Sequence, residues 1–248
     1  MKKVFEQNIK VLASQIDLKT KMGLVQSLCI IQDNMCEYFK DLKCDGITLI
    51  PQCGCFFVVT KTKVHFNKFA KWLDVFKVST ELFDTSRIVV NLETIFTDND
   101  SGEVFVTCHQ ELCAMDKESR KLRMINTTPF PSDLDCKSDD GSKVFSRFAV
   151  DYSSEDLVDT VVVKNVNIDM YRHTNNVEYV KFIMSTFNID FVLGNDITDF
   201  EIHYVSESKL GDKLDIYRKN INDEIFFEIR REEVVCVRAK LSVMRVDI

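Results

Sequence analysis

The sequence has few residues or runs of the kinds that mark fibrous, low-complexity or membrane proteins. Only seven of its 248 residues are glycine and three are proline, which excludes collagen-like and low-complexity chains. No apolar run approaches the roughly 20 residues of a membrane-spanning helix. The first residues lack the apolar core of a secretory signal and the Arg- and Ser-rich character of a transit segment. We therefore expect a globular protein of the cytoplasm, without membrane insertion.

Patterns that bind metals are also scarce. The chain has nine cysteines and four histidines, with no Cys-x-x-Cys pair. Cys53 and Cys55 are separated by one glycine, which is too close and too isolated for a zinc site. An odd number of cysteines in a chain of this size favours reduced thiols over a disulfide framework. We expect no metal and no cofactor.

The charge balance is acidic. Lys and Arg number 32 against 39 Asp and Glu, a formal net charge of −7. This argues against non-specific nucleic-acid binding, and an acidic partner would need a local basic patch. Two groups of basic residues are candidates for such a patch: Lys61, Lys63, Lys68 and Lys71, and then Arg120, Lys121 and Arg123.

What the sequence does contain is a pattern that occurs twice. In the first half, a short strand at residues 3–11 precedes a stretch with apolar residues at three- and four-residue steps over 23–43, which predicts an amphipathic helix. Alternating β-branched and aromatic residues then predict antiparallel strands at 56–66, 75–82, 87–96 and 104–115.

The second half follows the same order. A strand at 158–166 and a helix at 177–191 precede strands at 200–206, 213–219, 224–230 and 234–246. Such a helix with one apolar face packs on a sheet, and two such units can form a continuous sheet with both helices on one side. We predict an α+β fold with an N-terminal half at 1–128, a connecting segment at 129–156 and a C-terminal half at 157–248.

The segment between strand and helix in the second half is the most informative. It places Asp169 and His173 four residues apart, directly before the helix. Asn175 or Asn176 can cap that helix. The first backbone N–H groups of a helix have no partner within it and can stabilise a developing oxyanion.

This segment resembles the acyl-acyl-carrier-protein thioesterases, which belong to the hotdog-fold thioesterases. Their motif reads roughly Asp-x-Asn-x-His-x-Asn-Asn-x-x-Tyr, and five residues match it: Asp169, His173, Asn175, Asn176 and Tyr179. Other segments match in order and spacing along the chain: Gln32-Asp33, Trp72, Asp116 with Arg120, the run Tyr204 to Glu207, and Gly211-Asp212. The resemblance extends from about residue 5 to 246.

The resemblance implies a tandem, or double, hotdog fold with two long helices on one face of a large antiparallel sheet. It implies hydrolysis of fatty acyl thioesters on acyl-carrier protein, bound through its phosphopantetheine arm, by a monomer or homodimer. Asp169, His173 and Glu207 are the expected catalytic residues, and Asn175 and Asn176 mark the oxyanion-stabilising helix start. The acyl chain is expected against residues of the first half: Leu28, Ile31, Met35, Phe57 and Val59.

The chain departs from the family at one catalytic position. The family's catalytic Asn falls at Tyr171, and a phenol lacks the combined donor and acceptor of a carboxamide. The role of Tyr171 is therefore left open. Two alternatives remain: a thioesterase acting on acyl-CoA or another specialised acyl thioester, and a non-catalytic acyl-binding hotdog protein.

Overall fold

Two compact units, Met1–Val144 and Phe145–Ile248, make up the chain in the computed structural model. The structure describes residues 3–138 and 144–246. Each unit is built as a helix packed on an antiparallel sheet. All nine cysteines lie in the described residues and are free thiols.

In the first unit, the sheet runs in the order β1-β3-β4-β5-β2, with every neighbouring pair antiparallel. A two-residue strand, β6, pairs with β5. The strands are β1 (Val4–Lys10), β2 (Cys55–Phe66), β3 (Val75–Thr85), β4 (Val89–Asp98), β5 (Val104–Asp116) and β6 (Leu122–Arg123). These bounds agree with the predicted strands to within about three residues.

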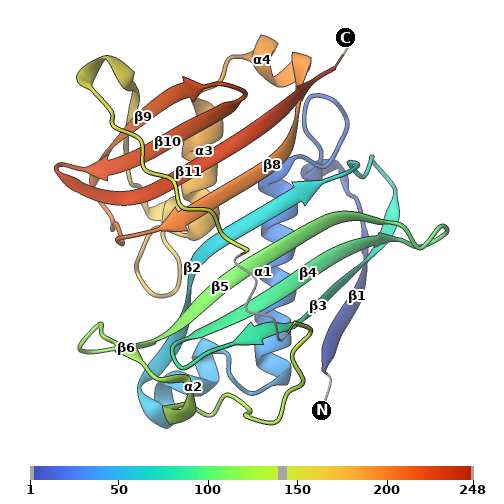
Figure 1. Cartoon of the computed structure of the whole chain (residues 1–248), viewed down its shortest axis with the longest axis vertical. Helices are drawn as coiled ribbons and strands as arrows, with labels where there is room; N and C mark the ends of the chain where they lie inside the picture. Colours follow the sequence, from blue (N-terminus) through green and yellow to red (C-terminus); the bar gives the residue numbers. More distant parts are fainter. Residues whose placement is uncertain (1–2, 139–143, 247–248) are drawn as a thin grey trace. The chain divides into compact units, whose positions relative to one another are not determined.

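Helix α1 (Leu24–Asp41) covers one face of this sheet, as the three- and four-residue spacing of its apolar residues predicts (Figure 1). Its buried side chains include Leu28, Ile31 and Met35. The Phe39 ring packs 4.9 Å from that of Phe57 on β2, measured between centroids. A shorter helix, α2 (Gly46–Cys53), follows, capped by the side chain of Asp45.

The second unit repeats this arrangement. Its sheet runs β8-β11-β10-β9-β7 with antiparallel pairing throughout, which is the strand order of the first unit. The strands are β7 (Leu157–Val162), β8 (Asn195–Tyr204), β9 (Lys213–Ile221), β10 (Glu224–Arg231) and β11 (Val234–Arg245). The predicted repeat of strand, helix and four strands is confirmed.

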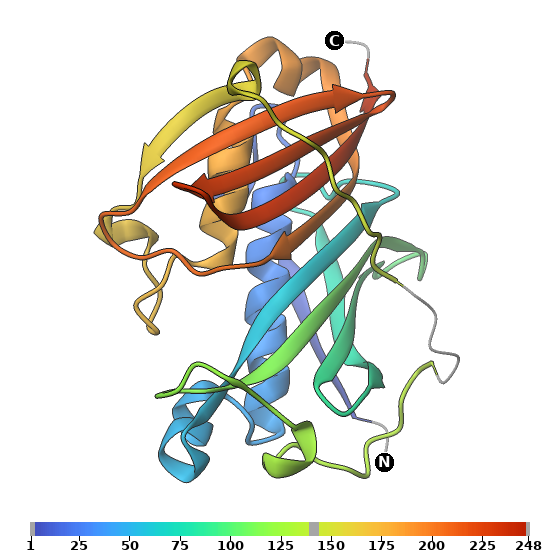
Figure 2. The same ribbon diagram turned by 60° about the vertical axis from the view of Figure 1, so that its left-hand side comes forward.

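The second helix is shorter than predicted. Helix α3 (Asn176–Ser185) ends before residue 191, and α4 (Ile189–Gly194) follows it. The break occurs because the side chain of Asn188 accepts a hydrogen bond from the Phe191 N–H and so starts a new helix. In Figures 1 and 2, strands β9 to β11 pass in front of α3. Tyr179, Val180 and Ile183 are among the α3 residues buried there.

The first strand of this unit is also shorter than predicted. It ends at Val162, and a single 3-10 turn (Asn165–Asn167) takes the chain to the segment that precedes α3. Within the described residues no helix is long and apolar enough to cross a membrane.

Candidate active site

A closed turn in the second unit carries the predicted acid and imidazole. Oδ1 of Asp169 accepts hydrogen bonds from the backbone N–H groups of Tyr171, at 2.8 Å, and His173, at 3.2 Å. The Asp169 N–H donates to the His173 carbonyl at 2.9 Å. Arg172 between them has φ of 67°, an uncommon value outside glycine. These bonds fix the backbone of His173.

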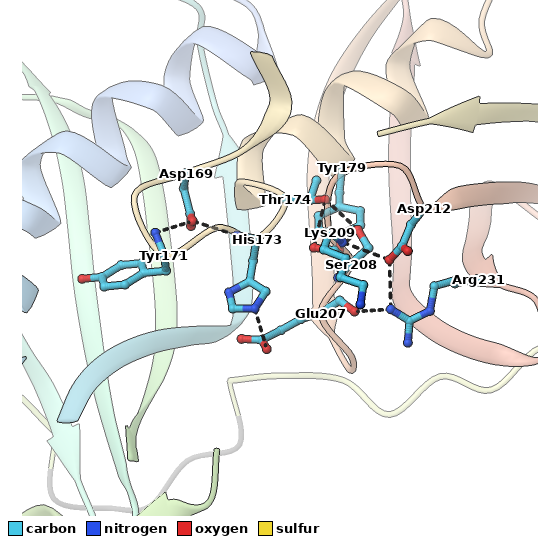
Figure 3. A network of polar contacts seen from close by, with 10 residues as sticks. All are labelled: Asp169, Tyr171, His173, Thr174, Tyr179, Glu207, Ser208, Lys209, Asp212 and Arg231. Atoms are coloured by element: carbon cyan, nitrogen blue, oxygen red, sulfur yellow. Dashed lines mark hydrogen bonds and ion pairs between the residues drawn. The ribbon is translucent and has the colours of Figure 1, made fainter. Parts of the chain in front are cut away.

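His173 and Glu207 point toward one another (Figure 3). Nε2 of His173 lies 3.4 Å from Oε2 of Glu207. Glu207 belongs to the segment between β8 and β9, so two separate parts of the chain supply the pair. The side chains are 28% and 42% exposed, which leaves both open to water and to a substrate.

A buried serine ties these two parts of the chain together. Ser208 is 1% exposed, and its Oγ lies 2.6 Å from Oγ1 of Thr174 and 2.7 Å from the Tyr179 hydroxyl. The Thr174 N–H also donates to the Ser208 carbonyl at 2.9 Å. Thr174 follows His173, and Ser208 follows Glu207. The network therefore sets the separation of the acid and the imidazole.

The hydroxyl of Tyr179 is a structural group in this network. Burial raises the pKa of Tyr179, although the hydrogen bond with Ser208 acts in the opposite direction. The phenol therefore stays protonated, and it accepts a hydrogen bond from the Ser208 N–H at 3.1 Å.

An arginine supports the backbone at Glu207. Nη1 of Arg231 donates to the Glu207 carbonyl at 3.2 Å and to Oδ2 of Asp212 at 2.9 Å. The Lys209 N–H donates to the same carboxylate at 2.9 Å. Burial would raise the pKa of Asp212, but the hydrogen bonds from Lys209 and Arg231 outweigh it and hold the pKa below its usual range. Asp212 is thus an anion that orients Arg231.

The start of α3 is capped by Asn175. Its side chain accepts a hydrogen bond from the Val177 N–H at 2.9 Å, so Asn175, and not Asn176, is the N-cap. Asn176 is the first helical residue, and its carbonyl accepts a hydrogen bond from the Tyr204 hydroxyl at 3.3 Å. The positive end of the helix dipole lies two residues from His173.

The other predicted residues belong to the same turn or to the first unit. The Tyr171 ring extends from the turn in a different direction from the His173 ring (Figure 3). The expected acyl-binding residues belong to the first unit, where Leu28, Ile31 and Met35 are buried on α1. Phe57 and Val59 are partly buried on β2 and pack against a core cluster that includes Met35.

Sequence reasoning did not find the supporting role of three residues. Thr174 and Ser208 are hydrogen bonded although they lie 34 residues apart in the chain. Arg231 is the last residue of β10, and no sequence feature sets it apart from the other arginines. Only the contacts of the folded chain single them out. Gly211-Asp212 is one of the segments that match the family in sequence, and φ of 87° at Gly211 shows why glycine fits there.

Two family models match the chain. The model of the acyl-ACP thioesterase N-terminal domain matches residues 2–128, and that of the C-terminal domain matches residues 151–240. Together they span most of the 248 residues. The chain belongs to the acyl-ACP thioesterase family.

Curated relatives are distant. A chloroplastic acyl-[acyl-carrier-protein] hydrolase of Cuphea viscosissima is 19% identical over 223 residues, which cover 85% of this chain and 53% of the relative. A chloroplastic palmitoyl-acyl carrier protein thioesterase of Arabidopsis thaliana is 20% identical over 216 residues, covering 82% and 52%. The chain thus spans about half the length of the curated relatives it matches.

Solved structures share the fold over nearly the whole chain. An acyl-ACP thioesterase from Bacteroides thetaiotaomicron superposes with a TM-score of 0.86 at 19% identity, covering 97% of this chain and 98% of that one. The 12:0-ACP thioesterase from Umbellularia californica gives 0.83 at 15% identity, with 98% of each chain covered. The predicted double-hotdog fold is confirmed.

Proposed function

We propose that this protein hydrolyses fatty acyl thioesters of acyl-carrier protein and releases free fatty acid. The observation that carries the proposal is the approach of His173 to Glu207 at 3.4 Å, at the start of α3. Membership of the acyl-ACP thioesterase family supports the substrate class. The chemistry needs an activated water, a polarised carbonyl and an apolar site for the chain, and each has a candidate.

In the proposed reaction, Glu207 orients a water molecule and accepts its proton, as a general base. The water oxygen bonds to the thioester carbon, and the oxyanion that forms is stabilised by the positive end of α3. The C–S bond then breaks, and the proton passes to the departing thiolate. His173 hydrogen bonds the water or the thioester and holds it beside Glu207.

Asp169 has the role of a positioning residue in this scheme. Its Oδ1 accepts hydrogen bonds from two backbone N–H groups within the turn. These bonds support a role for Asp169 in holding His173 in place, and not a role as the general base. Asn175 caps α3, and Asn176 begins it, so both act by placing the helix start.

The acyl chain is assigned to the first unit. Leu28, Ile31 and Met35 are buried on α1, and Met35 belongs to the core cluster against which Phe57 and Val59 of β2 pack. The turn with Asp169 and His173 occurs only in the second unit's sequence. We accordingly assign acyl binding to residues 1–128 and hydrolysis to 157–248, joined by 129–156, in a cytoplasmic enzyme.

Acyl-carrier protein is acidic, and the basic groups that could meet it are partly paired. Lys61 lies 3.0 Å from Glu111, and Lys68 lies 3.5 Å from Asp98. This pairing supports acyl-CoA as the alternative substrate, because binding a CoA thioester does not require a basic surface large enough to dock a protein.

The test is hydrolysis of acyl-carrier-protein thioesters of graded chain length, followed by release of free thiol, beside acyl-CoA of the same lengths. We expect faster turnover of the carrier-protein thioesters than of acyl-CoA, and we expect Glu207→Gln to reduce that turnover. Faster turnover of acyl-CoA would overturn the carrier-protein assignment. Tyr171 at the family's Asn position favours a second candidate, a non-catalytic acyl-binding protein, which bound fatty acid without turnover of either substrate would support.

A further inference from the structure

A row of polar side chains crosses the core of the first unit between α1 and its sheet. Nε2 of Gln7 on β1 donates to Oδ1 of Asn34 at 2.8 Å, and Nδ2 of Asn34 donates to Oγ1 of Thr80 at 2.6 Å. The Thr80 hydroxyl lies 2.7 Å from that of Thr94 on β4. Asn34, Thr80 and Thr94 are each at most 1% exposed. These groups satisfy one another.

Gln110 on β5 extends the row but is not satisfied. It pairs in register with Leu92 on one side and Thr62 on the other. Because side chains alternate along a strand, it shares the α1-facing side of the sheet with Thr94. Gln110 is 5% exposed and Thr62 is 3% exposed. Within residues 3–138 and 144–246, the buried Oε1 of Gln110 accepts no hydrogen bond.

An unpaired amide in a core is costly. Leaving a buried acceptor unsatisfied costs about 1–3 kcal/mol, and most buried side-chain polar atoms in proteins have a partner. An apolar residue of similar size at Gln110 would avoid that cost. Its presence points to a partner that enters the core from outside the chain.

This row of polar side chains lies beside the apolar side chains to which we assign acyl binding. On α1, Asn34 lies between Ile31 and Met35. On β2, Val59 pairs with Leu112 and Thr62 pairs with Gln110, so the two face the same side. An acyl chain held by Ile31, Met35 and Val59 therefore runs past Gln110 and Thr62.

We infer that Gln110 and Thr62 form a specificity site for an oxygen substituent on the acyl chain, a hydroxyl in particular. This inference rests on the proposed function. A hydroxyl can donate to Oε1 of Gln110 and accept from its amide or from the Thr62 hydroxyl. A site built to bind a hydroxyl disfavours the analogue that lacks it, since its own buried groups then stay unpaired.

The test compares saturated acyl-carrier-protein thioesters with chains of the same length that carry one hydroxyl at successive positions. For the wild type, kcat/KM is expected to be at least about 10-fold higher for one hydroxyl position than for the saturated chain. Gln110→Met should lose that preference and hydrolyse the saturated chain at least as well. Gln52→Met, at an exposed position of α2, is the matched control and should keep the wild-type ratio.

Two further measurements keep the outcome clear. Gln110→Met should unfold at the same or a higher temperature, because it removes an unpaired amide, and Thr62→Val gives a second variant if Gln110→Met does not fold. Equal kcat/KM at every hydroxyl position, or a preference that survives Gln110→Met, would overturn the inference and indicate a buried water as the partner of Gln110. If no thioester is turned over, the proposed function fails, and the ratio of Kd values for free hydroxylated and saturated fatty acids decides this inference separately.

Discussion

Nε2 of His173 lies 3.4 Å from Oε2 of Glu207. The segments that carry them are joined by the next residues along the chain, Thr174 and Ser208, whose hydroxyls are 2.6 Å apart. The pair is thus exposed enough to react, while the hydroxyl contact between Thr174 and Ser208 is buried. This separation allows the chemistry and the positioning to be tested by different substitutions.

Glu207→Gln should remove the proposed base and keep the shape of the site. Because general acid–base help supplies about 10²- to 10⁴-fold in rate, kcat is expected to fall by at least about 10²-fold with KM little changed. His173→Ala should lower kcat by a similar factor. Glu233→Gln, an exposed carboxylate of the same unit, is the control. Near-wild-type rates for both Glu207→Gln and His173→Ala would place the chemistry elsewhere.

Tyr171→Asn restores the carboxamide found in the family at this position. The substitution should maintain or raise kcat if the carboxamide-dependent mechanism operates here. Tyr171→Phe, which removes only the hydroxyl, separates loss of the phenol from gain of the amide. Loss of turnover in both variants would mean that the phenol has a role of its own.

Ser208→Ala should destabilise the protein and misplace Glu207. It removes one hydrogen bond from each of two buried hydroxyls, those of Thr174 and Tyr179, which keep their bonds to the Ser208 backbone. A hydrogen bond contributes about 0.5–1.5 kcal/mol to stability. Urea denaturation should show a fall in the free energy of unfolding of that order, with a lower kcat. Ser206→Ala, two residues earlier, is the control. The positioning role is wrong if kcat is unchanged in the folded Ser208→Ala variant.

Asp212 predicts an acid-dependent contribution to stability. Its pKa is lowered in the folded protein, so the folded state binds its proton less readily than the unfolded chain, whose Asp pKa is about 3.9. The stabilisation is complete above that value and is lost as the pH falls through the folded pKa. Wild type should therefore be more stable than Asp212→Asn at pH 7, and the gap should close in acid. A gap that is constant with pH, or that Asp223→Asn reproduces, contradicts this assignment.

Met35→Ala tests the placement of the acyl chain. Met35 is buried on α1, and shortening it leaves space in the core of the first unit at a cost of about 2–5 kcal/mol in stability. The preferred acyl chain should become longer, with a smaller change in the maximal rate. Cys36→Ala, at the next and exposed position of α1, should leave the length profile unchanged. An unaltered profile in Met35→Ala would show that the chain binds elsewhere.

Local patterns were enough to predict most elements of the fold. The apolar spacing over α1 and the alternation along β2 to β5 arise because one face of each element is buried. That burial is visible in the sequence, because apolar residue types occupy the buried positions. The end of α3 was missed because Asn188 fits the solvent side of a continuing helix as well as it caps α4. That choice depends on one side-chain bond to Phe191.

The candidate site was predictable only where it is local in sequence. Asp169 and His173 are four residues apart and bond within one turn, so their spacing carries the information. The contacts of Ser208 with Thr174 and Tyr179 span 34 and 29 residues. Whether Oε1 of Gln110 has a hydrogen-bond partner depends on its neighbours in the folded chain. The residue pattern of one strand cannot predict it.

The two units share one strand order but differ in the segment that leads into the helix. A duplicated fold has two chain segments that lead into a helix, and the proposed hydrolysis uses only one of them. The segment before α3 ends in Asn175, whose side chain caps the helix, whereas the segment before α1 ends in Gly23, which has no side chain to do so. In the proposed reaction the chemical groups precede α3, so substitutions in the segment before α1 should alter substrate choice more than the reaction itself.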